Sequence, residues 1–587
     1  MFGISNKTSF LFICQGLVIK NNLLEIKDLK VGFHSDEGFT RVIKGISFEV
    51  KEGETVGLVG ESGSGKSVTS MSIMGLIPKP PGEITNGTIK FRGQNLVNLT
   101  NQQYSDIRGS KISMIFQEPM TSLNPVMKVG NQVLETILLH QEISKEDGKR
   151  KVIELFKEVG IPFPAQRYHY YPHQMSGGQK QRVMIAMAIA CEPKLLICDE
   201  PTTALDVTIQ KQVLELLLEL QKKRKMGILF ITHDLAVIGD IADKVLVMYK
   251  GEIVEEGSCE EIFSNPKHPY TKGLISCRPK LEKNPKRLLT VSDFIDTSEG
   301  NQKFVEPVLS AEIKKPNRDK SDPILEIVNL KKHFPIKGGF WGRTVDHFKA
   351  VDGVDMKIGK GKVVGLVGES GCGKTTLGRT ILRLIEPTVG SIIFKNENLK
   401  KFDRKELKKF RRNAQIIFQD PFASLNPRMT IGEILTEPLK IHHVGNNQKE
   451  RIEQAMFYLD KVQLEKNHLN RYPHEFSGGQ RQRICIARAL MLRPELIICD
   501  ESVSALDVSV QAQVLNLLLD LKDEFDLSYL FISHDLNVVK FISDEIGVMQ
   551  AGKIVEYNYA DEIYNNPQQR YTRELLSAIP AGKPSLF

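Results

Sequence analysis

Two glycine-rich segments combine residue types that bind phosphate groups. They read GESGSGKS at Gly60–Ser67 and GESGCGKT at Gly368–Thr375, and each follows a short apolar run. In this spacing the glycines let backbone N–H groups turn toward phosphate oxygens, the lysine adds a positive charge, and the last hydroxyl ligates Mg²⁺. The predicted phosphate-binding residues are Gly60, Glu61, Ser62, Gly63, Ser64, Gly65, Lys66, Ser67, Gly368, Glu369, Ser370, Gly371, Cys372, Gly373, Lys374 and Thr375.

Two acidic pairs, Asp199-Glu200 and Asp500-Glu501, each close another apolar run. Continuous apolar runs indicate strands buried on both faces of a parallel sheet, and ligands bind at the carboxyl ends of such strands. In isolation such a pair more often means solvated loop acids, but a phosphate loop in the same half favours catalysis. We expect the aspartates to hold Mg²⁺ and the glutamates to act as general bases toward an attacking water.

Histidine and glutamine complete the predicted set. His233 and His534 end the next apolar runs, each 34 residues after the aspartate of its half. A lone histidine is more often structural, but the matching distances favour an imidazole that reaches the γ-phosphate. Gln117 and Gln419 also follow apolar runs, where their amides can touch magnesium or water. The predicted catalytic residues are therefore Glu200, Glu501, His233, His534, Gln117 and Gln419, and the predicted Mg²⁺ ligands are Ser67, Gln117, Asp199, Thr375, Gln419 and Asp500.

The motifs occur twice in the same order because the chain is a tandem repeat. MIFQEPMTSLNP at Met114–Pro125 returns as IIFQDPFASLNP at Ile416–Pro427, and FITHDL returns as FISHDL. The two loop lysines are 308 residues apart, whereas the later motifs are 301 or 302 apart, which indicates a duplication with one changed loop. Apolar runs alternate with amphipathic stretches such as Arg451–Leu464, so each half is predicted to be α/β with an inserted helical region.

Composition excludes several classes of protein. The 587 residues are 41% hydrophobic and 26% charged, so the chain is neither mostly disordered nor a disulfide-rich mini-protein. The sequence has no run of about 18 uncharged apolar residues, so it encodes no ordinary membrane span. A net charge of +8 is mild at this length and requires no nucleic-acid partner. The eight cysteines form no CxxC pair and are typical of a reducing cytoplasm.

The sequence SGGQ occurs at Ser176–Gln179 and Ser477–Gln480, where the serine can cap a helix. With the motifs above, these segments resemble the nucleotide-binding domains of ABC proteins over nearly all of residues 24–280 and 324–580. The resemblance implies an α/β fold of two tandem P-loop NTPase (ABC) domains, each with a mostly parallel core sheet, an antiparallel β subdomain and a helical subdomain. It adds these ATP-binding residues: Ser176, Gly177, Gly178, Gln179, Ser477, Gly478, Gly479 and Gln480.

The resemblance also implies that neither half acts alone. ABC domains face each other head to tail, so the phosphate loop of each half would close ATP against the SGGQ segment of the other. Asp206 and Asp507 would lie at the seam between the two sites. Neither half lacks a catalytic residue, so two competent sites are expected.

The segment HPYTKGLISCRP at His268–Pro279 is echoed by QRYTRELLSAIP at Gln569–Pro580. These tails resemble the oligopeptide, dipeptide and nickel importer branch of the family. This implies an ATP-hydrolysing importer subunit for peptides or a related small solute, peripheral at the cytoplasmic face of the inner membrane. Its expected partners are two permease subunits and an extracytoplasmic solute-binding protein, with no nucleic acid. The alternative is a soluble twin-ABC ATPase acting on the ribosome, although such factors usually carry a long, charged, helical linker.

On this basis the chain divides into four parts. Residues 1–22 form an N-terminal extension, residues 23–280 the first ABC ATPase domain with its tail, residues 281–323 a linker, and residues 324–587 the second domain with its tail. The expected cofactors are ATP and Mg²⁺. An iron–sulfur cluster is not expected, because only Cys277 lies where some peptide importers carry four cysteines. The sequence leaves open the solute, the relative turnover of the two sites, and the aromatic that stacks on adenine, for which Phe33, Phe39, Phe334 and Phe348 are candidates.

Overall fold

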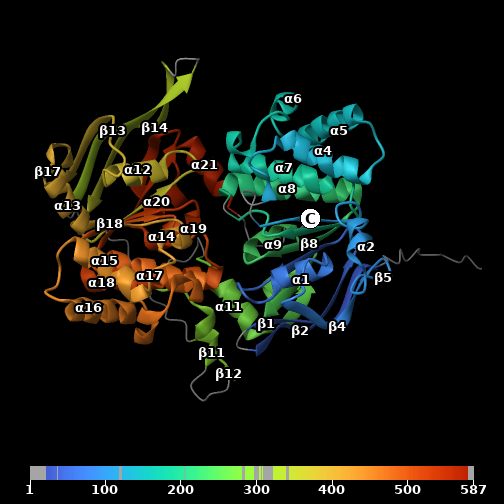
Figure 1. The fold of residues 1–587 in the computed structure, drawn as a ribbon. Helices are drawn as coiled ribbons and strands as arrows, with labels where there is room; N and C mark the ends of the chain where they lie inside the picture. The colour runs from blue at the N-terminus through green and yellow to red at the C-terminus, as the bar shows by residue number, and fades with distance from the viewer. Residues whose placement is uncertain are drawn as a thin grey trace, which may run out of the picture.

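The computed structural model describes residues 22–35, 38–117, 122–203, 205–279, 285–296, 303–305, 307, 322–338 and 343–579. The expected N-terminal extension lies outside the described residues, apart from Asn22. Figure 1 shows the chain as two halves side by side, the first coloured blue to green and the second yellow to red. Each half repeats the same set of layers, as the duplicated sequence requires.

A six-stranded sheet forms the centre of each half. Its strand order is β10-β9-β3-β8-β7-β6 in the first half and β22-β21-β15-β20-β19-β18 in the second. All neighbouring strands are parallel except the β9–β10 and β21–β22 pairs. The first sheet consists of β3 (Thr55–Val59), β6 (Ile112–Ile115), β7 (Leu195–Asp199), β8 (Gly227–Thr232), β9 (Lys244–Tyr249) and β10 (Glu252–Ser258). The second consists of β15 (Val363–Val367), β18 (Ala414–Ile417), β19 (Leu496–Asp500), β20 (Ser528–Ile532), β21 (Glu545–Gln550) and β22 (Lys553–Tyr559).

The central strands are buried along their whole length, as their unbroken apolar sequences predict. Every residue of β3, β7, β8, β15, β19 and β20 is buried. Layers cover both faces of a parallel sheet, so polar side chains gather only where the strands end. The phosphate loops, acidic pairs and histidines all follow the carboxyl ends of these strands, which brings them to one edge of the sheet.

A second, antiparallel sheet accompanies each core sheet. Its order is β2-β1-β4-β5 in the first half and β14-β13-β16-β17 in the second. Its strands are β1 (Asn22–Ser35), β2 (Gly38–Lys51), β4 (Gly82–Phe91), β5 (Gln94–Asn95), β13 (Pro323–Gly338), β14 (Arg343–Gly359), β16 (Val389–Phe394) and β17 (Glu397–Asn398). This sheet packs its apolar face on the core sheet, with Ile26, Leu29 and Leu58 in one buried cluster.

Helices cover the sheets and form the insertion in each half. The first half contains α1 (Lys66–Ile73), α2 (Asn101–Ser105), α4 (Val129–His140), α5 (Lys145–Glu158), α6 (Pro164–Arg167), α7 (Gly177–Ile189), α8 (Val207–Arg224), α9 (Leu235–Ile241), α10 (Cys259–Ser264) and α11 (Pro269–Ser276). The second half contains α12 (Lys374–Ile381), α13 (Arg404–Asn413), α14 (Pro421–Ser424), α15 (Ile431–Ile441), α16 (Gln448–Lys461), α17 (Gly478–Leu490), α18 (Val508–Phe525), α19 (Leu536–Ile542), α20 (Ala560–Asn565) and α21 (Arg570–Ser577). The insertions are α4–α6 and α15–α16, where amphipathic spacing predicted helices.

The tail of each half contacts the other half. After α11, the segment containing the turn η2 (Val291–Phe294) packs against α18, and Leu288 exchanges two hydrogen bonds of 2.9 Å with the Asn516 side chain. In the opposite direction, Lys211 of α8 donates to the Ser577 carbonyl of α21 at 3.3 Å, and Figure 1 shows these helices beside each other. Part of the region expected to be a linker is therefore packed, because Leu288, Val291 and Phe294 are buried.

Replacing Asn516 with alanine tests this contact between the halves. Both partners are about 3% exposed, so the change leaves the N–H and carbonyl of Leu288 buried without their partner. An unpaired buried polar group costs about 1–3 kcal/mol. We expect faster hydrogen exchange of the Leu288 amide, measured by mass spectrometry, while exchange in the core strand β7 stays unchanged. Undiminished protection of Leu288 would contradict the contact.

Candidate functional site

Each phosphate loop joins a buried strand to a helix through residues with left-handed backbone angles. Gly60 has φ 156°, and a Cβ there would lie 2.2 Å from the Met248 carbonyl oxygen. Gly368 repeats this, with φ 151° and 2.1 Å to the Met549 carbonyl oxygen. Only glycine meets both conditions, so the glycines of the motif are required by the turn itself.

The loop lysines are buried and bind their own loops. Lys66 Nζ donates to the carbonyls of Gly60 and Glu61 at 2.7 and 2.8 Å. Lys374 makes the equivalent bonds at 2.7 and 2.9 Å. Burial lowers the pKa of Lys66. A lysine held in this way against a glycine-rich loop suits a site for a polyanion.

The two strand-end aspartates contact the hydroxyl groups that follow the lysines. Ser67 Oγ lies 3.3 Å from Asp199 Oδ1, and Thr375 Oγ1 donates to Asp500 Oδ1 at 2.8 Å. Burial raises the pKa of both aspartates. Among the described residues, Asp500 Oδ2 is buried and has no hydrogen-bond partner. An unsatisfied carboxylate oxygen beside a hydroxyl fits the oxygen ligands of a hard divalent cation.

The next residue in each half, Glu200 or Glu501, is the centre of a small polar cluster. The Gln117 amide donates to Glu200 Oε2 at 3.0 Å, and His233 Nδ1 lies 3.0 Å from Oε1. In the second half the Gln419 amide donates to Glu501 at 2.7 Å, while His534 Nδ1 lies 3.6 Å away. The six residues predicted to be catalytic therefore come together as two matching triads.

The electrostatics of the triads keep the glutamates charged. Burial acts against ionisation, but the hydrogen bond and charge of the adjacent histidine hold the pKa of Glu200 and of Glu501 below the ordinary value. Burial likewise opposes protonation of His233, yet Glu200 and then Asp507 raise the pKa of this imidazole. Both glutamates have positive φ, 49° and 48°, which is strained for a residue with a side chain and typical of functional positions.

Contacts between the halves are reciprocal. Asp206 precedes α8, and its Oδ2 accepts a hydrogen bond from the Ser370 N–H of the second phosphate loop at 3.2 Å. Asp507 precedes α18, and its Oδ2 accepts from the Ser62 N–H of the first loop at 2.9 Å. Asp507 Oδ1 also lies 4.0 Å from His233. Each phosphate loop is thus contacted by an aspartate of the opposite half.

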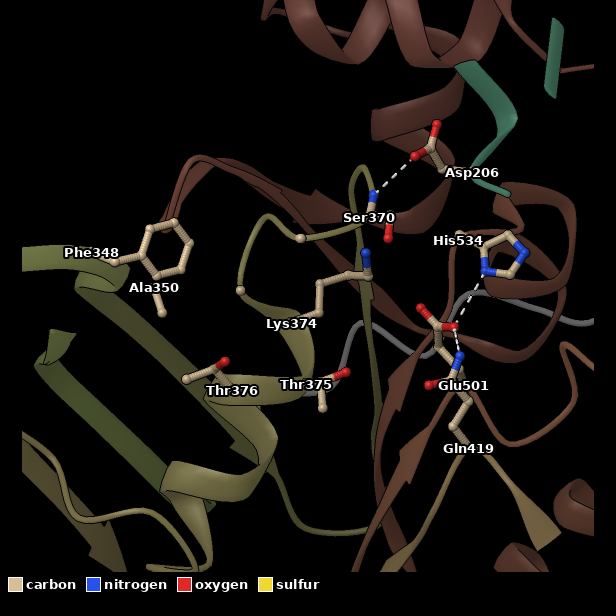
Figure 2. A pocket seen from close by; sticks show the side chains of 12 residues that line it. Asp206, Phe348, Ala350, Ser370, Lys374, Thr375, Thr376, Gln419, Glu501 and His534 are labelled. Atoms are coloured by element: carbon tan, nitrogen blue, oxygen red, sulfur yellow. Dashed lines mark hydrogen bonds and ion pairs between the residues drawn. The ribbon is translucent and has the colours of Figure 1, made fainter. Parts of the chain in front are cut away.

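A cavity of about 320 Å³ lies at the second site. Its lining includes Lys374, Thr375, Gln419, Glu501 and His534, together with Asp206 from the first half. Figure 2 shows the glutamate between the glutamine and the histidine, with Asp206 bonded to Ser370 above the lysine. The cavity is thus lined by the loop lysine, by the glutamate and histidine of the triad, and by one aspartate of the other half.

Phe348, one of the aromatic candidates for adenine stacking, also lines this cavity. It lies on β14 opposite Phe334 of β13, which is absent from the lining. The first half is different. Thr40 occupies the position of Phe348. The alignment follows from a hydrogen bond that both halves make four residues later, where Lys44 N–H donates to the Gly251 carbonyl and Asp352 N–H donates to the Gly552 carbonyl. The neighbouring Phe39 packs over Gly32, so the two sites differ where a base would stack.

Replacing Phe348 with alanine is expected to weaken ATP binding at the second site by about 5- to 150-fold, because base–aromatic stacking contributes about 1–3 kcal/mol. The measurement is a nucleotide titration that resolves two sites. Phe334→Ala is the control, since it removes the opposite ring of the same strand pair. Equal weakening by the two variants would contradict the assignment.

The SGGQ segments begin helices, as their sequence predicts. Ser176 and Ser477 cap α7 and α17, each accepting a hydrogen bond at 3.3 Å from the glutamine N–H of the same segment. The structure does not place them in the cavity, whose described lining contains no residue of Ser176–Gln179. The described contacts between each phosphate loop and the opposite half therefore include the aspartates Asp206 and Asp507.

Four contacts of the site were not predicted from the sequence. Ser70 donates to Asp199 and Thr203 donates to Glu200. The tail tyrosines Tyr270 and Tyr571 accept hydrogen bonds from the phosphate loops. The recurrence of Tyr-Thr in both tails was the available signal for the last two.

None of the helices in the described part of the chain has the length and apolar character that crossing a bilayer requires. Two parallel α/β sheets, each with a phosphate loop and an acidic pair, define a P-loop ATPase with two nucleotide-binding halves. The sequence matches the family described as ABC transporter over residues 43–203 and 351–504. It also matches the oligopeptide/dipeptide transporter C-terminal region over residues 254–299 and 555–586.

Curated relatives match almost the whole chain. The glutathione import ATP-binding protein GsiA of Salmonella choleraesuis (strain SC-B67) is 45% identical over 96% of this chain and 90% of its own length. GsiA of Escherichia coli (strain K12) gives the same identity and coverage. Among solved structures, the dimeric post-hydrolysis cassette MJ0796 bound to ADP and Pi is 30% identical over 40% of this chain and 98% of its own, with a TM-score of 0.37.

The chain belongs to the ABC transporter family. It binds nucleotide and hydrolyses ATP as the motor subunit of an ABC importer. These matches confirm the predicted family, the α/β fold of two ABC domains and the importer function, and they do not support the ribosomal alternative.

Proposed function

We propose that the chain hydrolyses ATP at two composite sites, each using the catalytic triad and phosphate loop of one half and the SGGQ segment of the other. The observation that carries this proposal is a reciprocal pair of hydrogen bonds between the halves. Asp206 accepts one from the Ser370 N–H, and Asp507 accepts one from the Ser62 N–H. These bonds support a head-to-tail arrangement, in which each loop faces an aspartate of the other half. ATP would then bridge both faces, since its charge needs donors from each.

Each residue of the triad has a role in this proposal. Glu200 and Glu501, held charged at strand ends, accept a proton from the attacking water as general bases. Gln117 and Gln419 orient the glutamates and the water, and His233 and His534 approach the γ-phosphate. The loop lysines and backbone amides hold the phosphates in place, so the reaction depends chiefly on position and charge.

Mg²⁺ fits the aspartate side of each site. Ser67 with Asp199, and Thr375 with Asp500, would hold the ion, with Gln117 and Gln419 nearby; the unpaired Oδ2 of Asp500 supports this. When bound, Mg²⁺ neutralises charge on the β- and γ-phosphates. The protein contributes the hydroxyl and carboxylate oxygens, which it holds together next to the phosphate loop.

We further propose that the cargo is glutathione or a related short peptide. Relatives at 45% identity are named for glutathione import, and the tails match an oligopeptide/dipeptide transporter region. Two permease subunits and an extracytoplasmic solute-binding protein would be its partners, at the cytoplasmic face of the inner membrane. Uptake of labelled glutathione by a deletion strain, with and without competing dipeptide, distinguishes the cargoes.

The proposed domain boundaries are those of the sequence: an extension at 1–22, ABC domains at 23–280 and 324–587, and a linker at 281–323. The hydrogen bonds of Leu288 to Asn516 and the packing of Val291 against α11 favour counting residues 285–296 with the tail.

ATP-dependent crosslinking tests the composite sites. We expect a cysteine at Ser477 to crosslink to one at Ser62 when ATP is bound and hydrolysis is blocked, because closure brings the SGGQ segment to the opposite loop. Ser62 is exposed, whereas Gly60 has no room for a side chain. The control pairs Ser477→Cys with Ser370→Cys in its own half. Crosslinking within the half instead would refute the proposal; the readout is a mobility shift on denaturing gels.

A further inference from the structure

A tyrosine from each C-terminal tail contacts the phosphate loop of its own half. Tyr270 of α11 is fully buried and Tyr571 of α21 is 8% exposed. The hydroxyl of Tyr270 accepts a hydrogen bond from the Glu61 N–H at 3.0 Å, and that of Tyr571 accepts one from the Glu369 N–H, also at 3.0 Å. Burial raises the pKa of both phenols, so both are neutral. The same contact therefore occurs twice, across about 200 residues of sequence each time.

The tyrosine and the lysine hold opposite sides of one peptide group. The Gly60 carbonyl accepts from Lys66, and the N–H of the same peptide, that of Glu61, donates to Tyr270. The Gly368–Glu369 peptide is held in the same way by Lys374 and Tyr571. A lysine that moves to a phosphate releases the carbonyl, and the tyrosine then remains as the contact that fixes the peptide.

The same loop residue also reaches the opposite half. The Glu61 carboxylate accepts a hydrogen bond from Ser509 of α18, and Glu369 is bonded to Thr208 of α8. Burial first, and then the aspartate of the opposite half, raise the pKa of both glutamates. The tail beyond Tyr270 continues to the opposite half, where Leu288 meets Asn516. The tail, the loop and the facing helix thus form one connected set of contacts.

We propose that Tyr270 and Tyr571 are positioning residues, which hold the phosphate loops in the shape that accepts ATP. They act through the loop backbone and touch no reacting atom. The inference rests on the proposed assignment of the loops as ATP sites. Loss of the hydroxyl lowers the fraction of loops in the competent shape, which weakens apparent binding in proportion and leaves the chemical step unchanged.

The first test changes both tyrosines to phenylalanine in the full chain and measures steady-state ATPase activity. Phenylalanine keeps the buried ring and removes a single hydrogen bond, a change of about 3- to 10-fold in an equilibrium. We expect the KM for ATP to rise about 3- to 10-fold, with kcat within twofold. Tyr529→Phe is the matched control, because it loses a buried hydroxyl bond, to the Leu518 carbonyl, away from the loop. Its KM should not change.

The second test measures ATP affinity at one site. In a Lys66→Ala chain, whose first site binds ATP weakly, Tyr571→Phe should weaken ATP binding at the second site about 3- to 10-fold. Lys374→Ala should weaken it about 10- to 150-fold. An unchanged affinity with Tyr571→Phe, or an equal loss with Tyr529→Phe, overturns the positioning role. An affinity that Lys374→Ala leaves unchanged instead overturns the loop assignment, so the two failures are distinguishable.

Discussion

Replacing Glu200 and Glu501 together with glutamine is expected to lower the ATPase rate by about 100-fold or more, while ATP still binds. Glutamine keeps the size of the side chain and its bonds to the triad, but it cannot accept the proton of the attacking water. In both halves burial opposes ionisation, but the adjacent histidine holds the pKa of the glutamate below its ordinary value, so the wild-type side chain is a carboxylate and the glutamine is not. Phosphate release measures the rate, and equilibrium dialysis with labelled ATP measures binding.

The control for this experiment is Glu158→Gln. Glu158 is also partly buried and charged, but it pairs with Lys223 and Arg224 away from the site. Its loss should leave turnover intact. Activity above a tenth of normal in the double glutamine variant would rule out these residues as general bases.

The second large effect is expected at the loop lysines. Changing Lys66 and Lys374 together to alanine should weaken ATP binding by about 10- to 150-fold at each site, since a hydrogen bond to a charged group contributes about 1.5–3 kcal/mol. Both lysines are buried within bonding distance of their loops, so no other cation replaces them easily. The readout is nucleotide affinity by calorimetry. Removing Lys223 and Lys395, which form surface ion pairs, is the control; a comparable loss there would contradict a specific role.

The sequence was sufficient to predict the core of each site because its residues follow neighbouring parallel strands. The apolar runs Thr55–Val59 and Val363–Val367 are strands with those bounds, and Asp199 ends β7. Parallel strands bring their carboxyl ends to one edge, so Glu200, although 33 residues before His233, meets it there.

Other contacts depend on packing that no local pattern encodes. Tyr270 meets Glu61 across 209 residues, and Ser509 meets Glu61 across 448. Phe348 is preferred over Phe334 for stacking on adenine because it borders the cavity. The sequence offered four candidate aromatics and could not distinguish them. The polar composition of residues 281–323 predicts a linker, yet Leu288 bonds to Asn516 of α18 and Val291 and Phe294 are buried beside α11.

The contact of each tail with the opposite half affects how the ATPase activity depends on protein concentration. Two contacts join the halves without nucleotide, in addition to the peptide chain itself. They are the hydrogen bonds between Leu288 and Asn516 and the one from Lys211 to Ser577. Because both halves belong to one molecule, they need not find each other again by diffusion after separating. The total rate of ATP hydrolysis should therefore be first order in protein, and specific activity should stay constant from micromolar to nanomolar concentration.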